Sequence, residues 1–397
     1  EDGIRDRDVT GVQTCALPIC KGSFKNARNQ LTEFTMSELT RDAVETAIKN
    51  YIDPYLDSDL VAAKSVKDIQ IDGGNVTIDI VLGFPAKGYA DELSNKVAEV
   101  VKAADGIADV TVNVSSNIIA HAVQKGVQAV TGVKNIIAVA SGKGGVGKST
   151  TAVNLALALS AEGANVGMLD ADIYGPSQPR MLGAQGAKPE SPDGKRLKPV
   201  NSYHIQSMSI GYLVEEDTPM IWRGPMVTQA LEQLLKETDW EDLDYLVIDL
   251  PPGTGDTQLT LAQKIPVSGA VIVTTPQDIA LLDAVKGLKM FEKVEVPVLG
   301  VVENMSIHIC SECGHEEHIF AEGGGQRMAE NEHVDFLGGL PLDKAIRSDA
   351  DSGKPTVVAD PDGQIAKIYR EIARRTSAKL AQQKKDFTTK FPNIVIQ

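Results

Sequence analysis

Two cysteines in the last third of the chain, Cys310 and Cys313, lie two residues apart in the segment GVVENMSIHICSECGHEEHIF, residues 300–320. A Cys-x-x-Cys pair supplies two thiolates, whereas a structural zinc ion or an iron–sulfur cluster usually takes four ligands. The only other cysteines, Cys15 and Cys20, lie in an N-terminal stretch to which we assign no function. The pair therefore needs two further ligands from elsewhere.

Three arrangements would complete or replace this ligand set. A zinc site within one chain would use His315 and His318, but the four ligands then fall within nine residues, fewer than such sites normally span. A redox-active dithiol favours a helix N-terminus, and this segment has no clear helix start. In the third arrangement a second copy of the chain supplies two thiols, and a two-fold axis brings both pairs to one [4Fe–4S] cluster.

A second motif follows the apolar run IIAVAS and precedes an apolar helical segment. Its sequence, GKGGVGKST, fits the phosphate-binding loop G-x-x-x-x-G-K-[ST] in the strand–loop–helix context that this loop requires. Lys148 is expected to contact the β- and γ-phosphates, and Ser149 is expected to bind Mg²⁺. The residues predicted to bind ATP here are Gly142, Lys143, Gly144, Gly145, Val146, Gly147, Lys148, Ser149 and Thr150.

Acidic residues end two further predicted strands, at the edge where parallel sheets bind their ligands. Asp170 and Asp172 follow the run VGML; we predict that Asp172 orients the attacking water and that Asp170 lies near the Mg²⁺ shell. Asp249 ends the run YLVID at the Walker B position, where a carboxylate holds Mg²⁺. The PPG segment that follows is predicted to be a switch loop, which offers the Gly253 N–H to the γ-phosphate.

The early lysine, Lys143, makes this loop similar to the deviant phosphate loop of the MinD, ParA and nitrogenase iron-protein group. Two subunits face each other in that group. The resemblance implies that Lys143 reaches the partner's nucleotide and assists catalysis with Lys148, as an arginine finger does. It also implies that Asn304, at the end of VVEN, reads the adenine edge. Lys143 and the lone cysteine pair thus require the same dimer.

The segments DADIYGPSQP, MIWRGPM, DYLVIDLPPGTGD and VVENMSIHICSECGHEEHIF extend this likeness. Together they resemble the Mrp (ApbC) family of iron–sulfur cluster carrier ATPases over residues 135–385. The resemblance implies a homodimer that uses ATP, Mg²⁺ and a [4Fe–4S] cluster held by Cys310 and Cys313. Its partners would be scaffold donors and recipient apo-proteins, and its ATP hydrolysis would be slow and coupled to cluster transfer.

The elements that must position these residues form two domains. From residue 135 onward, short apolar runs alternate with helical segments, which predicts an α/β fold with a parallel sheet covered on both faces. Residues 36–116 predict a small α+β domain, with a helix over 39–55 and a hairpin turning at Gly73 and Gly74. This part is similar to the small domain fused in front of such ATPases, and we expect it to dock partners. Residues 117–134 are the predicted linker, and 386–397 a C-terminal tail.

Composition excludes several classes of function. The formal charge of −15 argues against broad nucleic-acid binding and against general binding to anionic membranes. No apolar run is long enough to span a bilayer. Four cysteines in 397 residues form no disulfide framework, so we expect a cytoplasmic protein. Residues 1–35 resemble translated sequencing-adapter read-through and are expected to be a non-native tail.

Three rival functions remain at this stage. A MinD- or ParA-like partitioning ATPase could use the amphipathic, locally basic segment 365–385 on a membrane. The alternative is that this segment packs on the sheet through Ile365, Ile368, Tyr369 and Ile372. An ATP-driven reductase like the nitrogenase iron protein is the second rival, although its two cluster thiols per chain lie far apart in sequence. The third is a zinc-bound scaffold.

Overall fold

The computed structural model describes residues 39–124, 126–214, 224–310 and 312–385. Cys15, Cys20, Arg223 of the MIWRGPM segment and the C-terminal tail 386–397 lie outside these ranges. The described residues contain one eight-stranded sheet, one three-stranded sheet and two pairs of very short strands.

The eight-stranded sheet has the order β15-β12-β11-β6-β10-β7-β9-β8. Neighbouring strands are parallel, except that β8 and β9 are antiparallel. The predicted α/β fold with a parallel sheet is therefore confirmed. The strands are β6 (Val133–Ala140), β7 (Val166–Asp170), β8 (Val200–Ser202), β9 (Ile205–Ser209), β10 (Leu243–Asp249), β11 (Gly269–Thr274), β12 (Val298–Glu303) and β15 (Phe336–Gly339).

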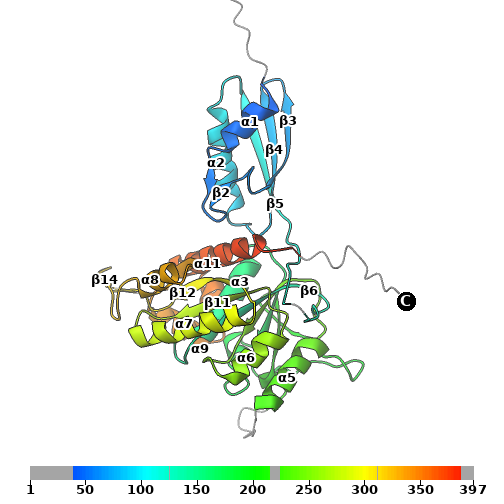
Figure 1. Ribbon diagram of the computed structural model, residues 1–397, viewed down its shortest axis with the longest axis vertical. Helices are drawn as coiled ribbons and strands as arrows, with labels where there is room; N and C mark the ends of the chain where they lie inside the picture. The colour runs from blue at the N-terminus through cyan, green and yellow to red at the C-terminus, as the bar shows by residue number, and fades with distance from the viewer. Residues whose placement is uncertain (1–38, 125, 215–223, 311, 386–397) are drawn as a thin grey trace, which may run out of the picture. The chain divides into compact units, whose positions relative to one another are not determined.

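Helices cover both faces of this sheet, which explains why its central strands are apolar at almost every position. One core cluster contains side chains of α3, α10 and α11, and the other contains side chains of α5, α6, α7 and α8 (Figure 1). These helices are α3 (Lys148–Ala161), α5 (Gly224–Glu237), α6 (Asp256–Lys264), α7 (Asp278–Lys293), α8 (Gly324–Asn331), α10 (Thr356–Ala359) and α11 (Gln364–Ala381). The short helices α4 (Gln178–Met181), η1 (Ile210–Tyr212) and α9 (Lys344–Asp351) complete this part of the chain.

The C-terminal helix α11 packs against the large sheet, as one of the two sequence interpretations predicted. Tyr369 and Ile372 are each 1% exposed, and Ile365 and Ile368 pack against the same core. The apolar stripe of α11 is thus buried and not available to a lipid surface. Across the described ranges, no helix has the length and apolar character needed to cross a membrane.

The front part of the described chain is a small α+β unit with its own core. Its sheet has the order β3-β4-β5, in which β3 and β4 are antiparallel and β4 and β5 are parallel. The hairpin turns at Gly73 and Gly74, as predicted, and Gly73 has the positive φ of 59° that such a turn needs. The elements are α1 (Arg41–Ile48), β1 (Ile52–Asp53), β2 (Ser58–Asp59), β3 (Val66–Asp72), β4 (Asn75–Leu82), α2 (Ala90–Lys102) and β5 (Asp109–Ser116).

The helix predicted over 39–55 is wrong beyond Ile48, where α1 ends. Beyond it, residues 52–53 form the short strand β1, and two features of the sequence keep residues 53–55 out of a helix. Pro54 disfavours helical backbone at Asp53, the residue before it. The Asp53 carboxylate then accepts a hydrogen bond from the backbone N–H of Tyr55 at 2.9 Å, which stabilises a turn instead of a further helical turn.

Candidate functional site

The loop at residues 142–147 joins the end of β6 to the start of α3, so its backbone lies at the N-terminus of a buried helix. Gly145 and Gly147 both have φ of +83°, a conformation that side chains with a Cβ rarely adopt. A Cβ added to Gly147 would also lie 2.1 Å from the amide nitrogen of Asn304. These glycines therefore permit a tight loop whose N–H groups and helix end favour an anion.

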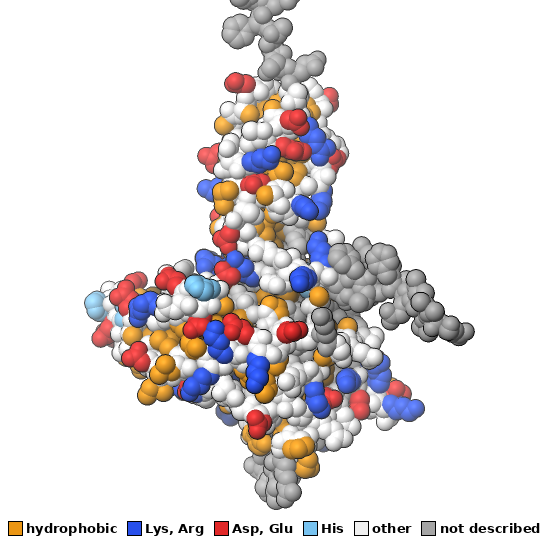
Figure 2. All heavy atoms as spheres, in the orientation of Figure 1, with side chains coloured by type: hydrophobic (Ala, Val, Ile, Leu, Met, Phe, Trp, Pro, Cys, Tyr) orange, Lys and Arg blue, Asp and Glu red, His pale blue; other side chains and the backbone are white. Residues whose placement is uncertain are grey.

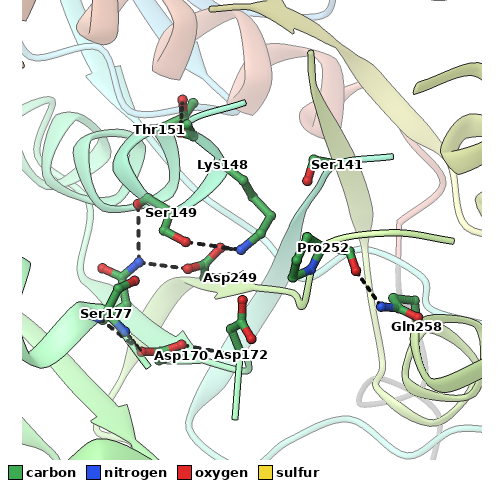
Figure 3. A network of polar contacts seen from close by, with 12 residues as sticks. Ser141, Lys148, Ser149, Thr151, Asp170, Asp172, Ser177, Asp249, Pro252 and Gln258 are labelled. Carbon is green, nitrogen blue, oxygen red and sulfur yellow. Dashed lines mark hydrogen bonds and ion pairs between the residues drawn. The ribbon is translucent and has the colours of Figure 1, made fainter. Parts of the chain in front are cut away.

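Lys148, the first residue of α3, extends across the sheet edge to Asp249 at the end of β10 (Figure 3). The two side chains form a buried ion pair, with exposed fractions of 6% and 0%. The Lys148 ammonium also donates to the Ser149 hydroxyl at 3.2 Å. The structure thus brings together the three residues predicted to bind the terminal phosphates and Mg²⁺.

Asp170, at the end of β7, is fully buried and lies in the same polar network (Figure 3). Its carboxylate accepts hydrogen bonds from the backbone N–H groups of Ser177 and Gln178, at 2.9 and 3.0 Å, and from the Ser209 hydroxyl at 3.2 Å. Burial, followed by the neighbouring negative charge of Asp249, raises the pKa of Asp170 to about 7. Asp170 therefore positions the loop that follows β7 and can also change its own charge near neutral pH.

Asp172 lies two residues beyond β7 and is half-buried. Burial raises the pKa of its carboxyl group, while the positive charge of Lys148 acts in the opposite direction. A carboxylate with a raised pKa, close to the phosphate-loop lysine, has the properties of a group that orients or deprotonates water.

Gln178 is a residue of this site that the sequence reasoning missed. Its side-chain amide nitrogen donates to Asp249 at 2.9 Å and to the Ser149 carbonyl oxygen at 3.2 Å, and the residue is 1% exposed. The amide thus ties the Walker B carboxylate to the first turn of α3. Its only sequence signal is its place in the turn after DADIYGPS, because a glutamine carries no charge that would single it out.

Gly253 lies in the PPG loop after β10 and has a φ of +101°. Its backbone N–H donates to the carbonyl oxygen of Ser141 at 3.0 Å, so this N–H is engaged in the structure and is not free to meet a phosphate. The Pro252 carbonyl oxygen accepts a hydrogen bond from Gln258 on α6 at 2.7 Å (Figure 3). Two adjacent residues of the loop are therefore held, one by the residue that follows β6 and the other by α6.

Asn304 follows β12 and is 8% exposed. Its amide nitrogen donates to the Val146 carbonyl oxygen at 2.9 Å, which ties the end of β12 to the phosphate loop. The side chain predicted to read an adenine edge therefore also supports the loop backbone.

Lys143 and Thr150 flank the loop's central residues, and both are half-buried. The Lys143 carbonyl oxygen accepts a hydrogen bond from the Ser141 hydroxyl at 2.9 Å. Within the ranges described, Lys143 forms no ion pair, in contrast to Lys148. The two lysines of one loop therefore occupy different electrostatic environments.

Cys310 and Cys313 lie in the turn of a small hairpin between β13 (His308–Ile309) and β14 (Glu316–Glu317). The Cys310 N–H donates to the His315 carbonyl oxygen, and the Gly314 N–H donates back to the Cys310 carbonyl oxygen, both at 2.9 Å. Cys310 is half-buried, Cys313 is exposed, and both thiols are free. This hairpin presents both sulfur atoms from one tight turn.

The surroundings of Cys310 favour its thiolate form. Backbone N–H groups of Glu312 and Cys313 donate to the Cys310 sulfur and lower its pKa from the ordinary value. Among the residues that the structure describes, no group of three or more His, Cys, Asp or Glu side chains is placed to hold a metal ion. His318 uses its Nδ1 to contact the Ser306 carbonyl oxygen at 2.9 Å.

Large apolar side chains remain exposed in and next to the cysteine hairpin and on α7. Ile309, Ile319 and Phe320 are 42%, 50% and 42% exposed, and Ile279 and Leu282 of α7 are 69% and 65% exposed. Figure 2 shows apolar side chains gathered over α7, on the face of the sheet opposite α3 and α11. We call these five residues the apolar flank. Exposed apolar groups in such number are typical of an interaction surface.

Two family models match the chain in separate ranges. The model described as the NUBPL iron-transfer P-loop NTPase, of the ParA group, matches residues 132–377. The model described as an iron–sulfur cluster assembly protein matches residues 41–114. The first range contains the phosphate loop and the cysteine hairpin, and the second contains the small α+β unit.

Known relatives align over most of the chain. An iron–sulfur cluster carrier protein of Escherichia coli (strain K12) is 51% identical over 355 residues, which cover 89% of this chain and 96% of the relative. Another from Pseudomonas fragi is 60% identical over 270 residues, which cover 68% of this chain and 94% of the relative. Among solved structures, a nucleotide-binding protein from Archaeoglobus fulgidus in complex with ADP is 36% identical, with a TM-score of 0.52; the match covers 58% of this chain and 90% of that one.

Proposed function

This chain belongs to the iron–sulfur cluster carrier family of P-loop NTPases, and from that premise we propose that it hydrolyses Mg-ATP while it carries a [4Fe–4S] cluster between two copies of itself. The carrier function implies recipient apo-proteins, and we propose scaffold proteins as donors. We assign the NTPase and cluster-binding roles to residues 135–385 and a partner-docking role to residues 36–116, with 117–134 as the linker.

The observation that carries the proposal is the position of Cys310 and Cys313 in the turn of an exposed hairpin. A [4Fe–4S] cluster takes four thiolates, and one chain offers two in this turn. A two-fold axis beside the hairpin would place two identical pairs opposite each other. Exposure of the hairpin also suits a cluster that is cargo. Thiolates of a recipient can replace those of the carrier one at a time, and this ligand exchange leaves the oxidation state of the cluster unchanged.

The apolar flank supports the same dimer. Ile309 lies in β13, Ile319 and Phe320 follow β14, and Ile279 and Leu282 are exposed on α7; we propose that the facing copy covers both regions. A second copy that approached the hairpin would cover these side chains, and their burial would contribute to the association.

The nucleotide chemistry follows from the residues that surround Lys148. We propose that an incoming phosphate takes the Lys148 ammonium from Asp249, and that Asp249 and Ser149 then hold Mg²⁺. Asp172 orients the attacking water, and Asp170 holds the loop that carries Asp172. The charge that develops on the transferred phosphoryl group would be stabilised by Lys148 and by the Lys143 of the facing copy.

We propose that the PPG loop couples the state of the bound nucleotide to the dimer interface. The Gly253 N–H is bonded to the Ser141 carbonyl oxygen, and binding to a γ-phosphate requires that this bond break. We propose that ATP, but not ADP, makes this exchange and moves the loop and α6. A loop that responds to the γ-phosphate is the usual switch of P-loop proteins.

The experiment that tests the function is transfer of a reconstituted cluster to an apo-[4Fe–4S] protein, with and without Mg-ATP. We expect the recipient to gain the cluster and the carrier to lose it. Retention of the cluster with one-electron transfer to the partner would instead favour an ATP-driven reductase. The buried apolar stripe of α11 already argues against the membrane-partitioning alternative.

A further inference from the structure

A cavity of about 650 Å³ lies away from the phosphate loop and the cysteine hairpin. Its wall is formed by residues 56–67, the end of β4, residues 117–121 and the end of α11. Three of its lining residues, Lys64, Lys67 and Lys385, are lysines, and none is acidic. A wall of this kind is notable in a chain with a formal charge of −15.

Like charges gathered around one concave space repel each other, and an anion between them relieves that repulsion. The remaining polar lining is rich in donors: Ser58 and Ser65 offer hydroxyl groups, and Asn117 offers an amide. The nearby carboxylate of Asp57 is already paired with Lys379 at 2.7 Å. The cavity is therefore suited to negatively charged oxygen atoms.

The buried side chain of His121 gives independent support. The Asn135 amide nitrogen donates to the carbonyl oxygens of Ile119 and Asp244, at 2.9 and 3.2 Å, which fixes the orientation of this amide. Its oxygen then faces His121 and accepts from the backbone N–H at 3.0 Å, with ring Nδ1 at 2.9 Å. Because an amide oxygen only accepts, Nδ1 must carry a proton.

The other ring nitrogen, Nε2, is therefore the acceptor of the neutral imidazole, and it has no donor among the described residues. His121 is 3% exposed, and among the described residues no group lies within hydrogen-bond distance of Nε2. Buried polar atoms are normally paired, so an orphaned one points to a missing ligand. His121 lines both the lysine-rich cavity and an adjacent cavity of about 320 Å³.

We propose that this cavity binds a small multivalent oxyanion that also carries an O–H group: Lys64, Lys67 and Lys385 hold its charged oxygen atoms, and its O–H donates to His121 Nε2. Singly protonated phosphates and hydroxy-carboxylates share the required chemistry, so the ligand class is a polyphosphate or phosphate ester that keeps one proton, or a polycarboxylate that carries a hydroxyl group. The site is separate from the nucleotide and cluster sites and does not rest on their proposed roles. Its volume exceeds that needed for a single phosphate and fits a small organic molecule.

The test uses the full chain and two probes, inorganic pyrophosphate and citrate, measured by isothermal titration calorimetry. Lys64→Ala/Lys67→Ala should weaken binding of the preferred probe at least tenfold, because two of the three cations are lost. Lys49→Ala/Lys96→Ala is the matched control and should bind like wild type, since both lysines are exposed on the same small unit but do not line the cavity. The phosphate loop is unchanged in all three proteins, so any pyrophosphate that it binds contributes equally to the three titrations.

A local readout comes from the ring nitrogens of His121 in a ¹⁵N-histidine spectrum, assigned with His121→Asn among the six histidines of the chain. The probe should shift the Nε2 signal and leave Nδ1, which is bonded to Asn135, nearly unmoved. A response to pyrophosphate alone would identify a phosphate site, and a response to citrate a carboxylate site. Equal affinities in wild type and Lys64→Ala/Lys67→Ala, with a static Nε2 signal for both probes, would overturn the proposal.

Discussion

The ammonium group of Lys148 forms a buried ion pair with the carboxylate of Asp249, so the residue expected to contact phosphate is held by the residue expected to bind Mg²⁺. Neither charge is left uncompensated inside the protein, where an isolated charge is costly. Phosphate and Mg²⁺ together offer each residue a new partner of opposite charge. Nucleotide binding can therefore exchange one set of compensated charges for another without exposing either residue.

Replacement of Lys148 should affect both nucleotide binding and the stability of the fold. Lys148→Ala should weaken ATP binding by about 10- to 100-fold, the equivalent of about 1.5–3 kcal/mol for a charge-assisted hydrogen bond. The same change should lower the free energy of unfolding by about 3 kcal/mol, because Asp249 stays buried without its cation. Fluorescent-nucleotide titration and urea denaturation measure the two effects. Wild-type affinity in a folded variant would contradict the assignment.

Lys143→Ala should behave differently, because this lysine is proposed to act on the partner's nucleotide. ATP affinity should stay within about threefold of wild type, while ATP turnover falls by about 10³-fold, the scale of an arginine finger. Turnover of the wild-type protein should also rise with protein concentration as dimers form. A variant that loses affinity and turnover equally would place Lys143 on its own nucleotide.

Two of the loop's glycines, Gly147 and Gly144, give a matched comparison. Gly147→Ala forces a Cβ into a left-handed backbone and against the Asn304 amide, so it should cost about 1–2 kcal/mol of unfolding free energy and abolish tight nucleotide binding. Gly144 has no positive φ, and a Cβ there meets no atom within 4 Å. Gly144→Ala should therefore melt within about 1 °C of wild type. Similar melting temperatures for both variants would refute the strain argument.

The raised pKa of Asp170 predicts that the free energy of unfolding depends on pH. Its pKa is about 7 in the native state and near its ordinary value of 3.8 in the unfolded chain, so the native state binds a proton more tightly. Its contribution to stability therefore falls as the pH rises from about 4 to 7. Asp170→Asn removes this titration. As the pH rises from 4 to 8, the unfolding free energy of the variant should therefore increase relative to that of wild type. A pH-independent difference would show that Asp170 ionises normally.

Glu162, which follows α3, forms a buried network of hydrogen bonds that includes the small α+β unit. Its buried carboxylate accepts from Arg370 at 2.7 Å, Arg374 at 3.0 Å and the Gly88 N–H at 2.8 Å. Glu162→Gln should cost about 3 kcal/mol in urea denaturation, because it breaks a buried charge network. The control is Glu371→Gln, whose partner Arg375 is 39% exposed; it should cost under about 1 kcal/mol. Equal losses of unfolding free energy in the two variants would show that the Glu162 network stabilises the protein no more than the exposed Glu371–Arg375 pair does.

Much of the fold was predictable because apolar runs and glycine-rich loops carry local signals. The strands expected at IIAVAS, VGML, YLVID and VVEN all form, and the phosphate loop leads into the expected helix, α3. The short strands β8, β9 and β15 were not predicted, since their pairing depends on neighbours distant in sequence. The predicted helix ran past Ile48 into residues that instead form β1 and the turn at Asp53 and Pro54.

The candidate site was predictable in its charged residues and less so in its neutral ones. Lys148, Ser149 and Asp249 lie together because strand ends in a parallel sheet share one edge. Gln178 and the Gly253–Ser141 hydrogen bond could not be foreseen, because both depend on loop conformations.

The most direct test of the central claim is anaerobic reconstitution with iron and sulfide, followed by metal and sulfide analysis of the dimer fraction from size exclusion. We predict about four irons and four sulfides per dimer for wild type, and loss of both in Cys310→Ala/Cys313→Ala. His315→Ala/His318→Ala should keep the full cluster. Zinc bound to a monomer without sulfide, or iron retained without the two thiols, would contradict a cluster shared between two chains.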